Sequence, residues 1–132
     1  MLLVRPRAAH HAWNIHACMT RVINIADAPE WWERDPSYVY IGRGRGPGMF
    51  GLLGNPHRVS SPCPVATCEG VVHNRTSAIA AFEVYLSRRM EDDPDFARAV
   101  RGLKGKVLVC PGPYCGRGKP CHGDVYVRRV ES

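Results

Sequence analysis

The sequence lacks any apolar run that approaches the roughly 20 residues a membrane-spanning helix needs. Its amino-terminal stretch also lacks the unbroken apolar segment of a signal peptide, because arginines and histidines interrupt it. There are no internal repeats, no recognition-helix motif and no aromatic cluster suited to stacking bases. We therefore expect a cytoplasmic protein that does not associate with membranes and does not read nucleic-acid sequence.

Acidic residues are fewer than basic ones: 12 Asp and Glu against 18 Lys and Arg give a formal net charge of +6 over 132 residues. This length suits a single domain with one modest core. The basic excess favours an anionic partner, although it could also serve solubility alone. Residues 1–18 contain two of the arginines and no acidic residue. We interpret 1–18 as a loose extension, with Met19 as an alternative start, and 19–132 as the domain.

Disulfides are a less favoured use of the cysteines, since without an export signal the default compartment is reducing. Six cysteines in such a compartment indicate metal binding or chemistry more than cross-links. One of them, Cys18, belongs to the doubtful extension. The others fall into two loops: Cys63 and Cys68 in one, and Cys110, Cys115 and Cys121 in the other.

Regular elements are predicted from apolar periodicity. Residues 21–25, 38–41 and 106–110 are short, rich in β-branched residues, and predict strands. The strand 38–41 is apolar on both faces, which is typical of a central strand. Apolar residues at helical spacing predict helices over 76–90, with Asn74 as N-cap, and over 94–101.

The final segment, 124–130, is compatible with a helix capped near Gly123 or with an edge strand, and its first residue, Asp124, which follows Gly123, favours the helix. Between the elements, residues 42–72 form an irregular run that must be held in place by something. The order of elements predicts a single small α/β domain, in which a central sheet of three to four strands is flanked by helices and long loops rich in Gly, Pro and Cys.

Several short motifs, taken together in their order and spacing, resemble the DUF4326 family of small bacterial and bacteriophage proteins. They are Tyr40-Ile41-Gly42-Arg43-Gly44, Gly54-Asn55-Pro56, Arg75 at the head of a helix, Leu103-Lys104-Gly105-Lys106 with Cys110, and Cys121-His122-Gly123-Asp124. The resemblance runs from about Met19 to the end and implies an uncharacterised activity. If the protein is phage-encoded, its compartment would be the host cytoplasm.

The chain departs from the family pattern in two places. The family usually has two cysteines separated by one residue after the third strand, whereas four residues separate Cys110 from Cys115 here. The loop after Gly54-Asn55-Pro56 is also longer than is usual in the family, and it carries the additional pair Cys63 and Cys68.

A structural zinc ion is the first hypothesis for the cysteines, because Zn²⁺ takes four thiolate or imidazole ligands. Cys110, Cys115 and Cys121 could supply three ligands, with Cys63, Cys68 or His122 as the fourth. A site joining both loops would explain how the long loop is held. The alternative is that the cysteines are free, or that some pair as disulfides.

Ligand binding is the second hypothesis, since ligands of such sheets gather at the carboxyl ends of the strands. If the strands that precede them pair, the loops beginning at Gly42 and at Cys110 should lie side by side. Backbone amides of a glycine-rich loop and arginine side chains suit phosphate. The candidate ligand-binding residues are Gly42, Arg43, Gly44, Asn55, Arg75 and Gly123. Asn55 could instead be a turn residue, and Arg75 could form an ion pair.

Catalysis is the third hypothesis. His122 and Asp124 could act as an acid–base pair, with Cys121 as a nucleophile. Alternatively, Asp124 caps a helix and His122 bonds to a carbonyl group. The sequence leaves open whether the protein is an enzyme.

Two functions from different classes follow. The first is a domain that binds a nucleotide-like or other anionic ligand at strand ends. Whether it is also an enzyme that acts on this ligand stays open. The second is a zinc-stabilised module that binds a host protein or nucleic acid through basic loops.

Overall fold

The computed structural model describes residues 19–43 and 52–132. Three parallel strands form its sheet: β1 (Arg21–Asn24), β2 (Tyr38–Tyr40) and β3 (Val107–Cys110). The strand order is β1-β3-β2, so that β3 pairs with both of the others. The α/β class and the three short strands predicted from periodicity are confirmed.

The prediction of a central position for 38–41 is wrong, because β2 is an edge strand and β3 lies in the middle. Aromatic neighbours account for the apolar character of β2. Trp31 packs edge-on against Tyr38, and Trp32 stacks on Tyr40. Both tryptophans come from the connection between β1 and β2, which contains two short 3-10 helices, η2 (Ile25–Asp27) and η3 (Trp32–Arg34).

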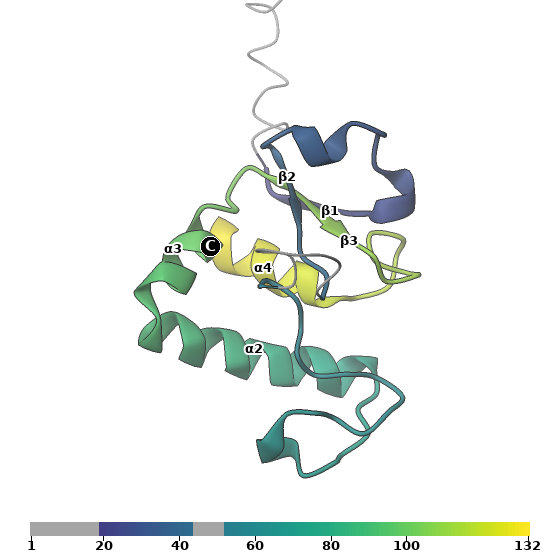
Figure 1. Ribbon diagram of the computed structural model, residues 1–132, viewed down its shortest axis with the longest axis vertical. Helices are drawn as coiled ribbons and strands as arrows, with labels where there is room; N and C mark the ends of the chain where they lie inside the picture. Colours follow the sequence, from purple (N-terminus) through teal and green to yellow (C-terminus); the bar gives the residue numbers. More distant parts are fainter. Residues whose placement is uncertain (1–18, 44–51) are drawn as a thin grey trace, which may run out of the picture.

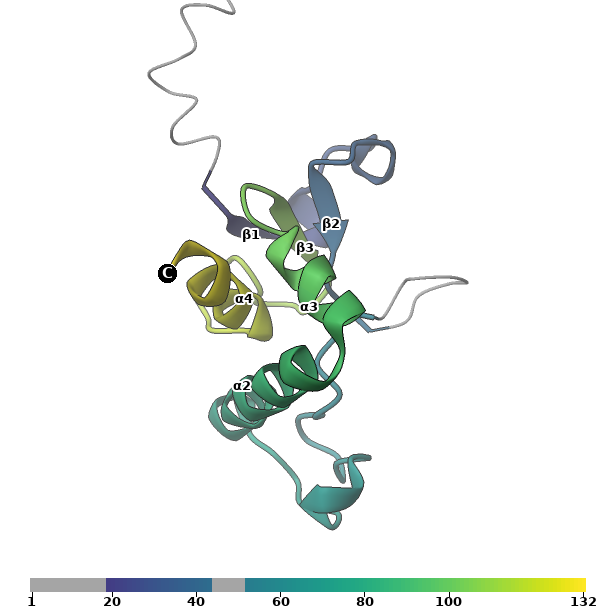
Figure 2. The same ribbon diagram turned by 90° about the vertical axis from the view of Figure 1, so that its left-hand side faces the viewer.

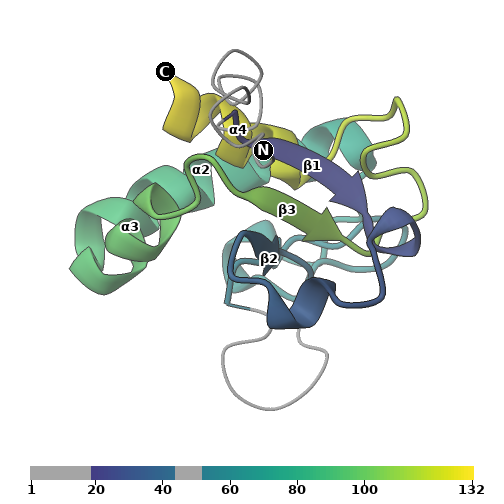
Figure 3. The ribbon, with the colours of Figure 1, turned by 90° about the horizontal axis from the view of Figure 1, so that it is seen from above.

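Three helices lie on one side of the sheet (Figures 1 and 2). They are α2 (Arg75–Asp92), α3 (Pro94–Arg101) and α4 (His122–Glu131). The helix α4 packs on β1, and α2 packs on α4 and α3 farther from the sheet. Seen from above, β3 runs between β1 and β2 (Figure 3). No helix in the described part of the chain is both long and apolar enough to cross a membrane.

Each helix begins at a residue that caps its amino end. Asn74 and Ser77 form a capping box at α2, as the sequence predicts for Asn74. Asp93 accepts a hydrogen bond from the backbone N–H of Phe96 at the start of α3. The final segment is a helix, as favoured; it begins at His122, and Cys121 is its N-cap.

The core fills the space between the sheet and the helices. Its largest fully buried side chains come from every layer: Ile41, Phe82, Leu86, Val100, Leu108, Val109 and Tyr126. Burial of each such side chain stabilises the fold by roughly 1.5–3 kcal/mol. The core thereby fixes the starts of α2 and α4 close to the carboxyl ends of the strands.

Candidate functional site

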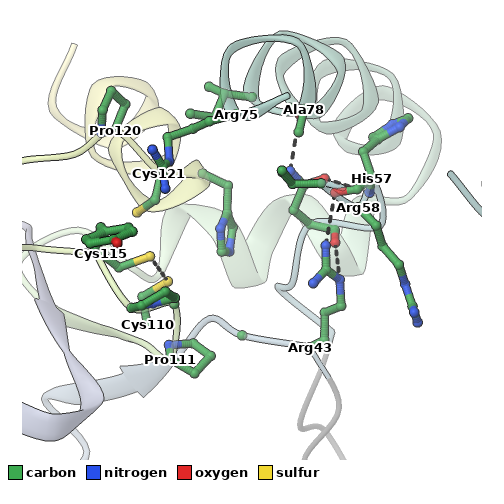
Figure 4. A pocket seen from close by; sticks show the side chains of 18 of the residues that line it. Arg43, His57, Arg58, Arg75, Ala78, Cys110, Pro111, Cys115, Pro120 and Cys121 are labelled. Carbon is green, nitrogen blue, oxygen red and sulfur yellow. Dashed lines mark hydrogen bonds between the residues drawn. The ribbon is translucent and has the colours of Figure 1, made fainter. Parts of the chain in front are cut away.

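A cavity of about 610 Å³ lies beyond the carboxyl ends of β2 and β3. It is lined by the segments that follow these two strands, by the starts of α2 and α4, and by Asn55 and loop residues 57–61. Parallel pairing of β2 with β3 brings Gly42 and Pro111 into contact, as the sequence predicts for these two loops. Figure 4 shows Cys110, Cys115 and Cys121 on one side of this cavity and Arg43, His57 and Arg58 on the other.

The charge of the cavity wall is one-sided. Three arginines line it, namely Arg43, Arg58 and Arg75, and none of the described lining residues is Asp or Glu. Arg75 lies over the ring of Tyr114, with its guanidinium carbon 5.3 Å from the ring centroid. This wall is therefore suited to an anion.

Three buried thiols form the wall nearest the sheet. Cys110 ends β3, Cys121 caps α4, and Cys115 lies in the loop between them. Their sulfur atoms all lie within 4.8 Å of one another, and those of Cys110 and Cys115 are 2.7 Å apart. Because both neighbouring thiols donate to its sulfur, the pKa of Cys115 falls well below the usual range. We call these three residues the thiol triad.

Asn24, at the end of β1, positions the loop that carries Cys115. Its side-chain amide donates hydrogen bonds to the carbonyl oxygens of Gly112 at 2.6 Å and Cys115 at 3.2 Å. Its own oxygen accepts a bond from the N–H of Ala26. The thiol triad is thus tied to both β1 and β3.

The three candidate catalytic residues at the start of α4 have different surroundings. Cys121 and His122 line the cavity. The Nε2 atom of His122 donates to the carbonyl oxygen of Ile41 at 2.6 Å, and burial lowers the pKa of the ring. The carboxylate of Asp124 accepts the backbone N–H of Cys121 at 3.0 Å and does not line the cavity. The geometry matches the alternative in which Asp124 caps the helix and His122 bonds to a carbonyl.

Among the candidate ligand-binding residues, Arg43 and Asn55 are engaged with the chain itself. The guanidinium of Arg43 donates to the carbonyl oxygens of Asn55 at 2.8 Å and His57 at 2.9 Å. The Asn55 side chain accepts from the N–H of His57 and donates to the carbonyl of Ala78. Both residues therefore shape the cavity wall.

The remaining candidates divide by position. Gly42 and Arg75 line the cavity. Gly123 is buried against β1, where a Cβ atom would lie 2.8 Å from Val22 Cγ2. The prediction for Gly44 falls outside the described residues.

A second group of metal-ligand type forms in the long loop before α2. His57, Cys63, Cys68 and His73 place their donor atoms within 4.8 Å of one another. The Nδ1 atom of His57 lies 3.4 Å from both sulfurs, and His73 Nε2 lies 3.5 Å from the sulfur of Cys68. We call these four residues the Cys/His tetrad. It and the thiol triad could each hold a metal ion such as zinc.

The hypothesis of one site joining both loops requires correction. The structure divides the five cysteines between two groups, and His57 and His73 complete the first. The loop folds back on itself beside the start of α2 (Figure 1). The triad lies elsewhere, where β3 ends at Cys110 and α4 begins after Cys121. Sequence reasoning missed both histidines. The signal that could have found them is the pattern H-x5-C-x4-C-x4-H over residues 57–73.

Comparison with known proteins identifies the family of the chain but no individual relative. Neither a curated protein nor a solved structure matches the chain. A family model described as DUF4326, a domain of unknown function, matches residues 23–132. This range includes the described strands from Ile23 onward, the three described helices, the cavity and both candidate metal groups. The chain belongs to the DUF4326 family.

Proposed function

We propose that the cavity binds a small anionic ligand of the nucleotide class. The observation that carries the proposal is the charge of the wall, where Arg43, Arg58 and Arg75 occur without any carboxylate among the described lining residues. In a partly enclosed space, positively charged side chains without neighbouring carboxylates raise the local concentration of anions and strengthen their binding.

Arg58 and Arg75 are the side chains best suited to contact the anion. The guanidinium of Arg43 already donates two hydrogen bonds to carbonyl oxygens, so it contributes charge and wall shape. Arg75 and Arg58 carry planar guanidinium groups, which match phosphate oxygens in a two-point contact. Neither forms an ion pair among the described residues.

An aromatic ring at the same wall favours a nucleotide over a simple inorganic anion. The side chain of Tyr114 lines the cavity and is 50% exposed. Arg75 already lies over this ring. A base stacked beside Tyr114 would leave its phosphate within reach of the same arginine.

A reaction on the ligand would depend on the thiol triad. His122 Nε2 bonds to Ile41, and Asp124 bonds to the amide of Cys121, so an acid–base pair is the weaker hypothesis. Cys115 has the lowered pKa that a nucleophilic thiol needs, and its neighbour Cys121 lines the same cavity.

Isothermal titration tests the proposal with phosphate, AMP, ATP and uncharged adenosine. We expect the nucleotides to bind and adenosine to bind at least about tenfold more weakly, with affinity falling as salt increases. R75A should weaken nucleotide binding about tenfold or more. R88A is the matched control, because Arg88 is an exposed arginine of the same helix, roughly 20 Å away along α2.

Two results would contradict the proposal. One is the absence of binding by every anion tested. The other is an equal effect of R75A and R88A, which would assign any binding to overall charge.

The alternative is a metal-stabilised module that binds a host protein or nucleic acid. Its metal stabilisation has structural support, whereas its binding of a macromolecule has less. The Cys/His tetrad favours metal stabilisation. In this alternative, a basic loop that includes Arg43 contacts the host protein or nucleic acid, but the guanidinium of Arg43 donates its hydrogen bonds to backbone carbonyl oxygens. We therefore propose ligand binding as the function of the cavity.

A further inference from the structure

We propose that His57, Cys63, Cys68 and His73 bind one zinc ion in a closed tetrahedral site that holds the loop 57–73 in its fold. This inference is independent of the ligand proposed for the cavity. It rests on donor geometry, on the orientation of one imidazole ring, and on the lack of an apolar core in the loop.

The spacing of the donor atoms fits zinc. With Zn–S near 2.3 Å and Zn–N near 2.0–2.1 Å, tetrahedral geometry separates a sulfur from a nitrogen by about 3.6 Å. Three sulfur–nitrogen distances in the tetrad are 3.4, 3.4 and 3.5 Å. A single ion could therefore reach all of these atoms with little rearrangement.

The ring of His73 is oriented as a zinc ligand would be. Its Nε2 atom faces the sulfur of Cys68, while Nδ1 lies 3.0 Å from the hydroxyl of Ser77. A ligating histidine typically donates its other ring N–H to a nearby oxygen, which fixes the tautomer and the ring orientation. Ser77 is itself held by Asn74 in the capping box of α2. The helix start thus aims His73 at the tetrad.

The loop has little apolar burial to keep it folded. Three of its four valines, Val59, Val71 and Val72, are 46%, 52% and 58% exposed, respectively, and Val65 is half-buried, so they add little to a core. The buried side chains of this segment are the donors His57, Cys63 and His73. Segments without a sufficient core commonly depend on a metal ion for their structure.

Backbone geometry brings the two ends of the loop together around the donors. Ser60 N–H donates to the carbonyl of His73, and Cys63 N–H donates to that of Val71. A 3-10 turn, η4 (Ala66–Cys68), ends at Glu69, whose φ of 51° lies in the left-handed region. This tight reversal places Cys68 opposite Cys63, as two ligands of one ion require.

The thiol triad fits zinc less well than the tetrad. Two thiolates on one zinc ion lie about 3.8 Å apart. Cys110 and Cys115 approach to 2.7 Å, and the triad supplies three donors rather than four. We therefore assign the ion to the tetrad.

Elemental analysis of the reduced full-length chain tests the assignment after loading with zinc and dialysis. C63S should lose one equivalent of zinc relative to the wild type. C115S should keep the wild-type zinc content. The two variants are matched, because each replaces a buried cysteine, 6% exposed at Cys63 and 8% at Cys115. A wild-type chain that retains no zinc, or a C63S variant that retains the wild-type content, would overturn the assignment.

Alkylation of the wild type keeps the test decisive if C63S does not fold. Zinc should slow the modification of Cys63 and Cys68 at least tenfold, measured by peptide mass mapping, and a chelator should remove this protection. Equal rates with and without zinc at these two cysteines would overturn the proposal. Cobalt loading should in addition give the visible absorption of a tetrahedral ion with two thiolate ligands, whereas a spectrum without thiolate-to-cobalt bands would count against it.

Discussion

The Nε2 atom of His122 lies 2.6 Å from the carbonyl oxygen of Ile41, and this bond joins the first residue of α4 to the residue that follows β2. Ile41 is fully buried, so its carbonyl group has no access to water as a replacement partner. The next residue, Gly42, lines the cavity. One hydrogen bond therefore connects the start of a helix to the rim of the candidate site.

Removal of this bond should destabilise the fold. We expect H122A to lower the free energy of unfolding by roughly 1–3 kcal/mol, because the carbonyl of Ile41 is left without a donor. H122Q should lose less, since its amide nitrogen can occupy a position similar to that of Nε2. Urea unfolding of both variants measures the difference, and equal losses would show that the hydrogen bond contributes little.

The stability that His122 provides should depend on pH. Burial lowers the pKa of its ring and outweighs the opposing effects of the Ile41 carbonyl and of Cys121 and Asp124. The folded state then keeps the ring neutral, whereas the unfolded state takes up a proton near pH 6.5. Since the unfolded state binds more protons below that pH, stability falls as the pH decreases.

Comparison with H122Q isolates this effect from the other histidines. Between pH 7 and pH 5, the stability of the wild type relative to H122Q should fall by up to about 1.4 kcal/mol per pH unit below 6.5. A difference between the two proteins that stays constant over this range would contradict the lowered pKa.

Gly123 should not tolerate a side chain. A Cβ atom there would lie 2.8 Å from Val22 Cγ2 and 2.9 Å from Ile41 Cδ1, so α4 or β1 would have to shift. We expect G123A to cost about 1–3 kcal/mol of stability in denaturant unfolding. G102A is the control, because its nearest contacts are at 3.4 Å and its φ is −68°. Similar stabilities of the two variants would contradict this packing.

Asn24 should control the exposure of Cys115. N24D keeps the acceptor for the amide of Ala26 but turns a carboxylate toward the carbonyl oxygens of Gly112 and Cys115. We expect a loss of roughly 2–3 kcal/mol and faster alkylation of Cys115. N74D makes the same substitution at an exposed helix cap, where Asp is also favoured, and should change little. Unchanged Cys115 reactivity in N24D would contradict the role assigned to Asn24.

Much of the fold could be predicted from sequence because periodicity and capping are local signals. Alternation in 21–25 and helical spacing in 76–90 located β1 and α2 to within a few residues. The proximity of Gly42 and Pro111 followed from the parallel pairing of the strands that precede them. The edge position of β2 could not be predicted in this way, because aromatic cover from Trp31 and Trp32 makes an edge strand look buried.

The candidate site was harder to predict because it depends on loops. The partners of Arg43 are backbone carbonyls of Asn55 and His57, and a sequence carries no signal for such bonds. The assembly of His57 and His73 depends on a chain reversal through irregular residues, which periodicity does not describe. The spacing of the histidines and cysteines over residues 57–73 indicates a metal site, but only the folded loop shows that their donor atoms meet.

The strand order has a consequence for how the chain acquires its structure. Both β1 and β2 form their ladders with β3, whose residues come more than 65 positions after β2 begins. During synthesis the backbone N–H and C=O groups of β1 and β2 therefore stay without their β3 partners until residue 110 has been made. Such long-range closure slows folding, and a chain interrupted before β3 would lack the strand with which both β1 and β2 pair.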